Sequence, residues 1–378
     1  MRNEIPALAA ARQPRGMVFG NGERLEGVVS FQVDNNSFYQ ADTFRVLLAL
    51  SAQPKDRGFD WWSKQQSIEI ELLAGFPNDP DAPSRSDLES LLIGNADDIE
   101  IDPVADEIII SGRDLTSKLI DMKRSVSFVK GPAPLTPSEV VKQIAKEVGL
   151  TPVVVDTDAP VGGYYQIVKA IVEANSTYWD IVSRLAQVSN FVAYVKGREL
   201  HFEPREHLTG DPYVIHWDAP SDDRDFPVLN AMRLRLSRNL SVSKDIRVRV
   251  VSYDQKQKRE IVAVAEKKRV RNKVTKKAGA SSEPPVEYTR AFPNLKQDQA
   301  QAKANALLAE IRQHEMNMHV EMPGDSILTT RMMVKLTGTS SDFDQTYYPS
   351  SIVRTFSLSD GYRMDLTAKN QSPDVEIS

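Results

Sequence analysis

An arginine and an aspartate stand side by side in IIISGRDLTSKLIDM, residues 108–122, where a short apolar strand leads into an amphipathic turn of helix. Charged pairs between a strand and a helix often occur at active sites, so Arg113 and Asp114 are the first candidates for chemistry. Catalysis by this pair would need a further group, and none stands nearby in the sequence. We therefore expect an architectural role: Gly112 lets the strand turn, Asp114 caps the helix, and Arg113 pairs with a carboxylate.

The histidines do not form a metal-binding or catalytic motif. HEMNMH, residues 314–319, is similar to a zinc-protease motif, but that motif needs histidines at i and i+4 to share a helix face. His201 and His216 fall on expected strands, and His207 falls in a loop. Because the G-x-S-x-G motif and the Gly-rich phosphate-binding and dinucleotide-binding motifs are also absent, we expect no metal, no cofactor and no serine hydrolase.

Two clusters of carboxylates leave one enzymatic alternative open. They are NADDIEID at 95–102 and SDDRD at 221–225. Paired carboxylates cleave glycosidic bonds, so a peptidoglycan-degrading enzyme is an alternative function. Both clusters fall in expected loops or on solvent-facing strand positions, however, and we favour a protein that is not an enzyme.

One segment is strongly basic. Residues 256–277 contain ten lysines and arginines, against only Glu260 and Glu266. The functional interpretation is contact with an acidic partner or a nucleic-acid backbone. The alternative is a solvated loop or hairpin at about 254–285, whose lysines prevent edge-to-edge pairing of strands. The residues that we single out for the first interpretation are Lys267, Lys268, Arg269 and Arg271.

Two adjacent tryptophans, Trp61 and Trp62, stand in DRGFDWWSKQQ. Exposed aromatic side chains favour subunit interfaces, so the pair is a candidate anchor for a neighbouring subunit. Packing in the core beneath a loop is the other interpretation, and the sequence does not separate the two.

The composition is that of a globular protein with several domains. The chain has 378 residues, 41% of them hydrophobic and 26% charged, with a net charge of -5 and no cysteine. The length suits two to four domains. The lack of cysteine excludes disulfides, thiol nucleophiles and cysteine-based zinc sites, and suits assembly in a reducing cytoplasm. We expect no cleaved signal, because Glu4, Pro6 and Arg12 leave the first apolar stretch too short. We expect no membrane anchor, because the longest uncharged run, residues 185–195, is too short to span a membrane.

The hydrophobic pattern changes along the chain from β to α/β and back to β. Alternating strands fill the first third, where Asn21-Gly22 predicts a tight hairpin. Two helices follow, one capped by Thr136 with Glu139 and one capped by Thr177 with Asp180.

The last third begins with long polar-alternating strands and contains a helix at about 296–315, capped by Asn294. In the final hairpin, a three-residue loop Ser359-Asp360-Gly361 would pair Leu358 with Tyr362 and Phe356 with Met364. We expect Gly361 to adopt the left-handed conformation there.

The ordered set of these motifs carries a family resemblance. The chain resembles the baseplate hub proteins of contractile phage tails, a late-control-protein-D-like family related to the N-terminal part of type VI secretion spike proteins. Gly112-Arg113-Asp114 is the sharpest element, and the phrase A-D-x-F at residues 41–44 is another. The similar segments are 25–50, 93–122, 136–150 and 176–202, together with the long helix and the last hairpin.

The resemblance implies an α+β, β-rich fold. Two tail-tube-like antiparallel β-barrels would be separated by a small α/β domain, with one long helix in the C-terminal half. We expect the first barrel at 1–122, the α/β domain at 123–206, and the second barrel at 207–378.

The resemblance also implies a structural virion protein. Three chains would form a baseplate hub that joins the sixfold tail tube to the threefold central spike and lines the DNA channel. The implied partners are the tail tube protein and the spike protein, with the tape measure protein and other baseplate proteins as further candidates and DNA only as cargo. The hub of a phage-tail-like bacteriocin or of a contractile injection system is an alternative. Assembly would take place in the host cytoplasm and the final location would be the tail baseplate.

Overall fold

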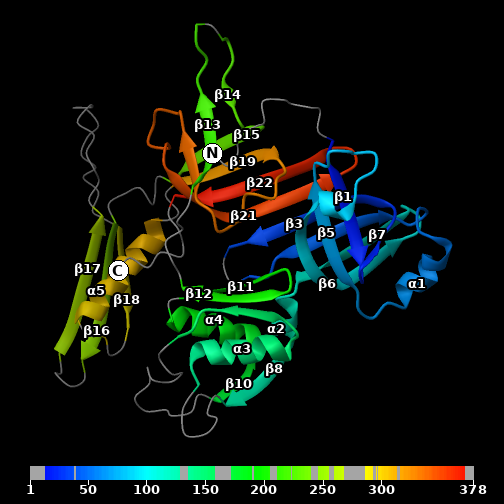
Figure 1. Cartoon of the computed structure of the whole chain (residues 1–378). Coiled ribbons are helices and arrows are strands. Elements are labelled where there is room, and N and C mark those ends of the chain that lie inside the picture. The colour runs from blue at the N-terminus through cyan, green and yellow to red at the C-terminus, as the bar shows by residue number, and fades with distance from the viewer. Residues whose placement is uncertain are drawn as a thin grey trace.

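The structure is a computed structural model that is rich in β-strands (Figure 1). It describes residues 13–37, 40–127, 135–157, 172–189, 191–204, 211–222, 224–239, 246–254, 259–267, 286–292, 295, 297–312 and 316–370. Most of the strands belong to one 14-stranded sheet, and three smaller sheets account for the others. The expected β-rich α+β class is confirmed.

The first half of the large sheet comes from the N-terminal third of the chain. It pairs its strands in the order β3-β4-β7-β6-β5-β1-β2, and every pair is antiparallel. The predicted hairpin at Asn21-Gly22 is confirmed, with φ of 51° and 84°. The elements are β1 Arg15–Gly20, β2 Glu23–Arg24, β3 Val28–Asn36, β4 Thr43–Ala49, η1 Lys55–Arg57, α1 Phe59–Ser63, β5 Glu69–Gly75, η2 Arg85–Asp87, β6 Glu89–Asp102 and β7 Glu107–Asp114.

The C-terminal part of the chain supplies the second half of this sheet. Its strands are β13 Tyr213–Asp218, β14 Val228–Leu229, β15 Arg233–Arg238, β19 Met316–Pro323, β20 Val334–Thr337, β21 Thr346–Ser357 and β22 Gly361–Lys369. β21 pairs with β3, so the two halves form one continuous hydrogen-bonded sheet. The strand order is open, and no closed barrel is found among the described strands.

A smaller α/β unit lies below the large sheet in Figure 1. The predicted capping boxes are confirmed: Thr136 accepts from the Glu139 N–H, and Thr177 accepts from the Asp180 N–H. β9 pairs parallel with β12, which also pairs with β11. The elements are α2 Ser117–Asp121, β8 Lys123–Ser127, α3 Pro137–Glu147, β9 Thr151–Val154, β10 Val172–Thr177, α4 Tyr178–Val188, β11 Phe191–Lys196 and β12 Glu199–Pro204.

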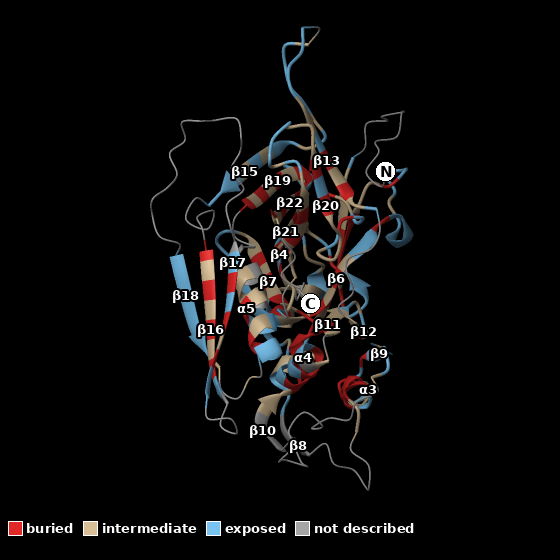
Figure 2. Ribbon diagram, turned by 90° about the vertical axis from the view of Figure 1, so that its left-hand side faces the viewer, coloured by how far each residue is buried: buried red, intermediate tan, exposed pale blue. Residues whose placement is uncertain are grey.

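A fourth group of elements stands to the side of the large sheet. It consists of β16 Ile246–Asp254, β17 Arg259–Lys267, β18 Val286–Ala291 and the helix α5 Gln297–Arg312. α5 packs on β16 and β17, whereas β18 is exposed along its whole length (Figure 2). The predicted cap Asn294 lies outside the described residues. None of the described helices is both long and apolar enough to cross a membrane.

Each of these regions has its own hydrophobic core. One core runs from Val18 to Ile110 and includes Phe356 and Tyr362 from the C-terminal hairpin. A second belongs to the small α/β unit and takes in Leu115 and Leu119, so α2 packs with this unit. Two further cores lie within the second half of the sheet and beneath α5. Because Phe356 and Tyr362 fill the N-terminal core, the first half of the sheet depends on residues from the far end of the chain.

The register of the last hairpin differs from the prediction. The structure pairs Phe356 with Tyr362 and Ser357 with Gly361, so the loop is Leu358-Ser359-Asp360. A shift of two residues keeps every side chain on the same face of the sheet, so Phe356, Tyr362 and Met364 are buried in either register. Leu358 is therefore at the loop tip, where it is 73% exposed. Gly361 has the predicted left-handed conformation, with φ of 77°.

Candidate functional site

Two motifs that are far apart in the sequence meet in the structure. Ala41-Asp42-Thr43-Phe44 leads into β4, and Gly112-Arg113-Asp114 ends β7. These strands pair so that Thr43 faces Arg113 and Phe44 faces Gly112. The Asp114 N–H donates to the Asp42 carbonyl oxygen at 2.8 Å. The two motifs therefore form one site, which we call the Asp42–Asp114 joint.

Gly112 is required by close packing of strands. It lies inside β7 rather than at a turn, so the predicted turning role is wrong. A Cβ at this position would lie 2.1 Å from the Asn95 carbonyl oxygen and 2.9 Å from the Ala96 Cα. β6 approaches this closely beside its bulge, which lies between Ala96 and Asp98.

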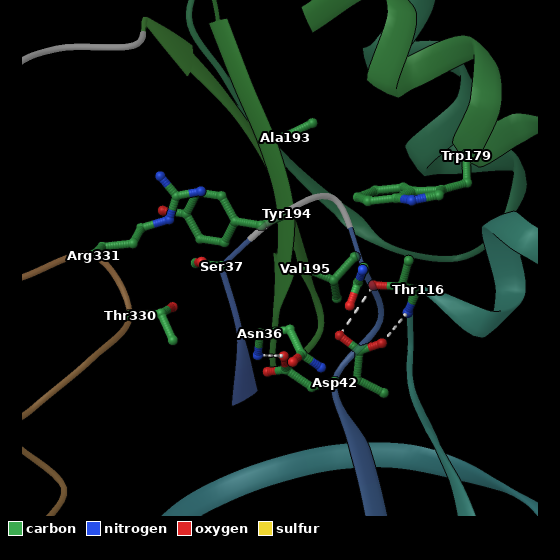
Figure 3. A pocket seen from close by; sticks show the side chains of 12 residues that line it. Asn36, Ser37, Asp42, Thr116, Trp179, Ala193, Tyr194, Val195, Thr330 and Arg331 are labelled. Atoms are coloured by element: carbon green, nitrogen blue, oxygen red, sulfur yellow. Dashed lines mark hydrogen bonds between the residues drawn. The ribbon is translucent and has the colours of Figure 1, made fainter. Parts of the chain in front are cut away.

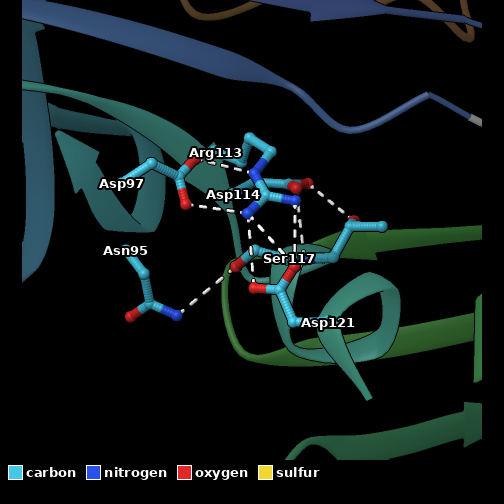
Figure 4. Close-up of polar contacts among 7 residues, drawn as sticks. Asn95, Asp97, Arg113, Asp114, Ser117 and Asp121 are labelled. Atoms are coloured by element: carbon cyan, nitrogen blue, oxygen red, sulfur yellow. Dashed lines mark hydrogen bonds and ion pairs between the residues drawn. The ribbon is translucent and has the colours of Figure 1, made fainter. Parts of the chain in front are cut away.

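Arg113 joins β6 to α2 (Figure 4). Its guanidinium binds Asp97 with both donors, Nε to Oδ2 at 2.7 Å and Nη2 to Oδ1 at 2.8 Å. Nη2 also lies 3.3 Å from Asp121 Oδ1 at the end of α2. Asp97 is the extra residue of the β6 bulge, which turns its side chain toward the arginine. The predicted carboxylate partner of Arg113 is thus Asp97, with Asp121 as a second.

Asp114 is buried, with 7% of its surface exposed. Its Oδ1 accepts from the Thr116 N–H at 3.1 Å, and its Oδ2 accepts from the Thr116 hydroxyl at 3.0 Å. This is an Asx-turn that ends the strand. α2 begins at Ser117, and its N-cap residue is Thr116, so the prediction that Asp114 caps the helix is wrong. Asp114 stands two residues before this N-cap, because the strand extends to Asp114 itself.

Asp42 connects the joint to the C-terminal half of the sheet. Its carboxylate accepts from the Asn36 N–H at 2.8 Å and from Asn35 Nδ2 at 2.7 Å. The Asn35 Oδ1 in turn accepts from Nη1 of Arg354, a buried arginine on β21. Arg354 also donates to the carbonyl oxygens of Asp325 and Leu328. A continuous polar network thus runs from Arg354 through Asn35 to Asp42.

The two aspartates are close enough to influence each other's ionisation. Burial, reinforced by the charge of Asp42, raises the pKa of Asp114 to about 7. Burial also raises the pKa of Asp42, although hydrogen bonds from Asn36 and Asn35 and the positive charge of Arg354 oppose that rise. Two carboxylates in one buried site do not both ionise readily, so the charge of each one opposes ionisation of the other.

A small pocket opens beside the joint (Figure 3). It is bordered by Asp42 and Asp114 from the sheet, by Trp179 of α4, and by Tyr194 of β11. Arg331 closes the remaining side, with its guanidinium carbon 3.8 Å from the centre of the Tyr194 ring. The pocket therefore lies where both halves of the sheet meet the small α/β unit.

Buried carboxyls with raised pKa values can serve as general acids or bases. The hydrogen bonds that the two carboxylates already accept bear on whether they act in this way. Both oxygens of Asp114 accept from Thr116, and both oxygens of Asp42 accept from Asn35 and Asn36. These acceptors hold the chain in place. The geometry favours a structural joint between three parts of the chain.

The two tryptophans have different environments. Trp62 in α1 is 1% exposed and belongs to the N-terminal core, which agrees with the core-packing interpretation. Trp61 is only partly buried, with its ring perpendicular to that of Trp62 and the Arg57 guanidinium 5.7 Å from its centre. Phe59 beside it is 54% exposed. A subunit contact at this helix stays a prediction.

The other candidates from the sequence are only partly described. Lys267 ends β17, while Lys268, Arg269 and Arg271 lie outside the described residues, as do His207 and His314. His201 and His216 lie on β12 and β13, as predicted. Sequence reasoning missed Arg354, Tyr194 and Arg331, because no local pattern marks them. Asp42 belongs to the A-D-x-F motif at residues 41–44, but the sequence assigned it no role of its own.

The fold is that of known tail proteins. No protein-family model and no curated protein matches the chain. Among solved structures, the tail protein from Neisseria meningitidis MC58 is 13% identical, with coverage of 96% of this chain and 99% of that chain and a TM-score of 0.65. The 43 kDa tail protein of prophage MuSo2 from Shewanella oneidensis is 14% identical, with coverage of 95% and 98% and a TM-score of 0.64. A chain of the Francisella PdpA–VgrG complex is 11% identical, with a TM-score of 0.53.

The alignment with the Francisella chain covers 98% of this chain but 54% of that one. At these identities the likeness shows the fold alone, which this chain shares with the tail protein from Neisseria and the prophage tail protein from Shewanella. The resemblance that the sequence indicated is thus confirmed as a likeness of fold to tail proteins.

Replacement of Gly112 by alanine should lower the free energy of unfolding by about 1–3 kcal/mol, because the new Cβ meets backbone atoms that must shift. Urea unfolding of the purified variant measures this. Gly75→Ala is the matched control, since a Cβ at that strand position meets its neighbours at 3.4 Å or more. Equal stability of the two variants would contradict the close approach of β6.

Replacement of Arg113 by methionine should cost about 1 kcal/mol, since a bidentate, partly buried ion pair is lost. The same substitution at Arg363 should leave the free energy of unfolding almost unchanged. Its Nη2 lies 3.7 Å from Asp360 Oδ1, and both side chains are exposed. In a double-mutant cycle, Asp97→Asn should cause little further loss in the free energy of unfolding once Arg113 is replaced. Fully additive losses would show that the two residues do not interact.

Replacement of Asp114 by asparagine should change how stability depends on pH. A raised pKa means that the folded state binds the proton more tightly than the unfolded state, so wild-type stability falls as pH rises from about 4 to about 7. Relative to the variant, this fall should approach about 1.4 kcal/mol per pH unit. Urea unfolding at several pH values measures it, with Asp98→Asn at an exposed position as control. A difference between Asp114→Asn and wild type that stays constant with pH would refute the assignment.

Proposed function

We propose that the chain is a structural tail protein that acts as a baseplate hub. The observation that carries this proposal is end-to-end similarity of fold: the alignment spans 96% of this chain and 99% of the Neisseria tail protein. The joint supports it, because the oxygens of both carboxylates accept hydrogen bonds from neighbouring residues of the chain itself.

We also propose the oligomer and its geometry. The two halves of the large sheet meet at β3 and β21 and have separate cores, which supports the proposal that each half takes the place of one tube-like barrel. Three chains would then present six such units to a sixfold tail tube and a threefold face to the central spike. The channel along the threefold axis would carry DNA, and the tape measure protein and other baseplate proteins would be neighbours.

Within this proposal the domain boundaries remain at residues 122 and 206. The separate core of the small α/β unit supports an intervening domain, although Leu115 and Leu119 join that core from before the first boundary. The chain would be located in the tail baseplate after assembly in the host cytoplasm.

A hub in a contractile injection system is the second candidate. The observation that favours it is the similarity to a chain of the Francisella PdpA–VgrG complex, which spans 98% of this chain. Both candidates predict the same trimer and differ in the particle that contains it. The peptidoglycan-degrading alternative stays a prediction.

The oligomer is tested with the purified full-length chain. Light scattering after size-exclusion chromatography should give three times the chain mass of 42.3 kDa, and negative-stain images should show threefold rings with a central hole. Clearing of a peptidoglycan suspension should be absent. A monomer mass at all concentrations up to hundreds of micromolar would overturn the trimeric hub, and peptidoglycan clearing would favour the enzyme.

A further inference from the structure

Three groups that commonly bind metal ions converge on the polar face of the second half of the sheet. His319 and Glu321 alternate with the buried residues Met318, Val320 and Met322 along β19, so both side chains point away from the core. Asp365 on β22 is directly opposite Glu321. His319 Nε2 lies 4.0 Å from Glu321 Oε1 and 3.9 Å from Asp365 Oδ1. One ligand atom from each residue lies within 4.8 Å of the other two.

The cross-strand pair of Glu321 and Asp365 places two negative charges opposite each other, which destabilises an antiparallel ladder. Arg233 on β15 neutralises part of this charge, because its Nη1 donates to Glu321 Oε1 at 2.9 Å. Arg235, which also belongs to β15, is the cross-strand neighbour of His319. Within the described part of the chain, Asp365 has no arginine or lysine within ion-pair distance, so its side of the cluster lacks a compensating cation.

The orientation of the imidazole is suited to a metal ligand. His319 Nδ1 lies 3.4 Å from the hydroxyl of Thr367, its cross-strand neighbour on β22. An Nδ1–H that donates to this hydroxyl leaves the lone pair on Nε2, which faces the two carboxylates. Metal-bound histidines are typically oriented by such a second hydrogen bond.

We propose that His319, Glu321 and Asp365 bind a divalent transition-metal ion of the Zn²⁺ type. Ligand bonds of about 2.0–2.2 Å at tetrahedral angles place ligand atoms about 3.4 Å apart, so small side-chain rotations on fixed strands would close the present 3.9 and 4.0 Å. A nitrogen ligand with two carboxylates suits zinc and its neighbours, whereas calcium and magnesium prefer oxygen ligands alone. The fourth position faces outward, where water or a group from another protein can complete the site.

The bound ion would tie β19 to β22 and replace repulsion between Glu321 and Asp365 with attraction. It would thereby stabilise the folded chain in proportion to metal concentration, as any ligand specific to the folded state does. This inference does not rest on the proposed tail function, and a failure of either leaves the other intact.

Titration of the metal-free full-length chain with ZnCl₂ in a calorimeter tests the proposal, and the visible absorption of added Co²⁺ reports coordination geometry. We expect one site per chain. His319→Ala and Asp365→Asn should each weaken binding at least tenfold. Thr367→Val should weaken it about tenfold through loss of the orienting hydrogen bond. Arg233→Gln should strengthen it, because a competing cation is removed from Glu321.

His216→Ala is the matched control, since His216 also stands beside a carboxylate, 3.0 Å from Asp218, but has no second one in its ion-pair contacts. It should leave Zn²⁺ affinity unchanged. Circular dichroism on each variant shows whether it is folded, and Glu321→Gln supplies a further ligand variant if one is not. Equal Zn²⁺ affinity of wild type and His319→Ala, or binding that His216→Ala removes, would overturn the proposal.

Discussion

The burial of the carboxyl groups of Asp42 and Asp114, where β4 begins and β7 ends, is the constraint on which the rest of the structure depends. Asp42 leads into β4 and Asp114 ends β7, and their backbones are joined by a hydrogen bond of 2.8 Å. From Asp42 the network reaches β21 through Asn35 and Arg354, and from Asp114 it reaches α2 through Thr116. Both halves of the large sheet and the small α/β unit are therefore held at one place.

Buried polar groups are costly unless they are satisfied, and this cost makes the joint selective for one arrangement. A slip of β4 against β7 by one residue would break the hydrogen bond from the Asp114 N–H to the Asp42 carbonyl oxygen and turn every side chain of the strand to the opposite face. Arg113 adds a second restraint on the outer surface, where it holds the bulge of β6 against the end of α2. Gly112, which has no Cβ, lets β6 approach β7 closely beside Arg113 and Asp114.

The continuous sheet joins the two larger cores of the chain through one hydrogen-bonded ladder. β21 pairs with β3 across seven residue pairs, and its Phe356 stacks on Phe31 with ring centres 5.3 Å apart. The polar faces of the same strands remain available to neighbouring molecules and ions. The proposed hub would use these outer faces for contacts between chains. The proposed metal site would use three side chains on them.

The sequence by itself determined the local features: the capping boxes at Thr136 and Thr177, the hairpin at Asn21-Gly22, the left-handed Gly361 and the β-rich class. These depend on residues within a few positions of one another, so short-range stereochemistry is sufficient. Only the tertiary structure decided the partners of Arg113, the meeting of Asp42 with Asp114, and the cluster at His319. It also corrected the last hairpin, because a two-residue shift leaves the hydrophobic pattern unchanged, and it moved Asp114 from a helix cap to an Asx-turn. Pairing between distant strands decides these features, and no local pattern encodes which strands will meet.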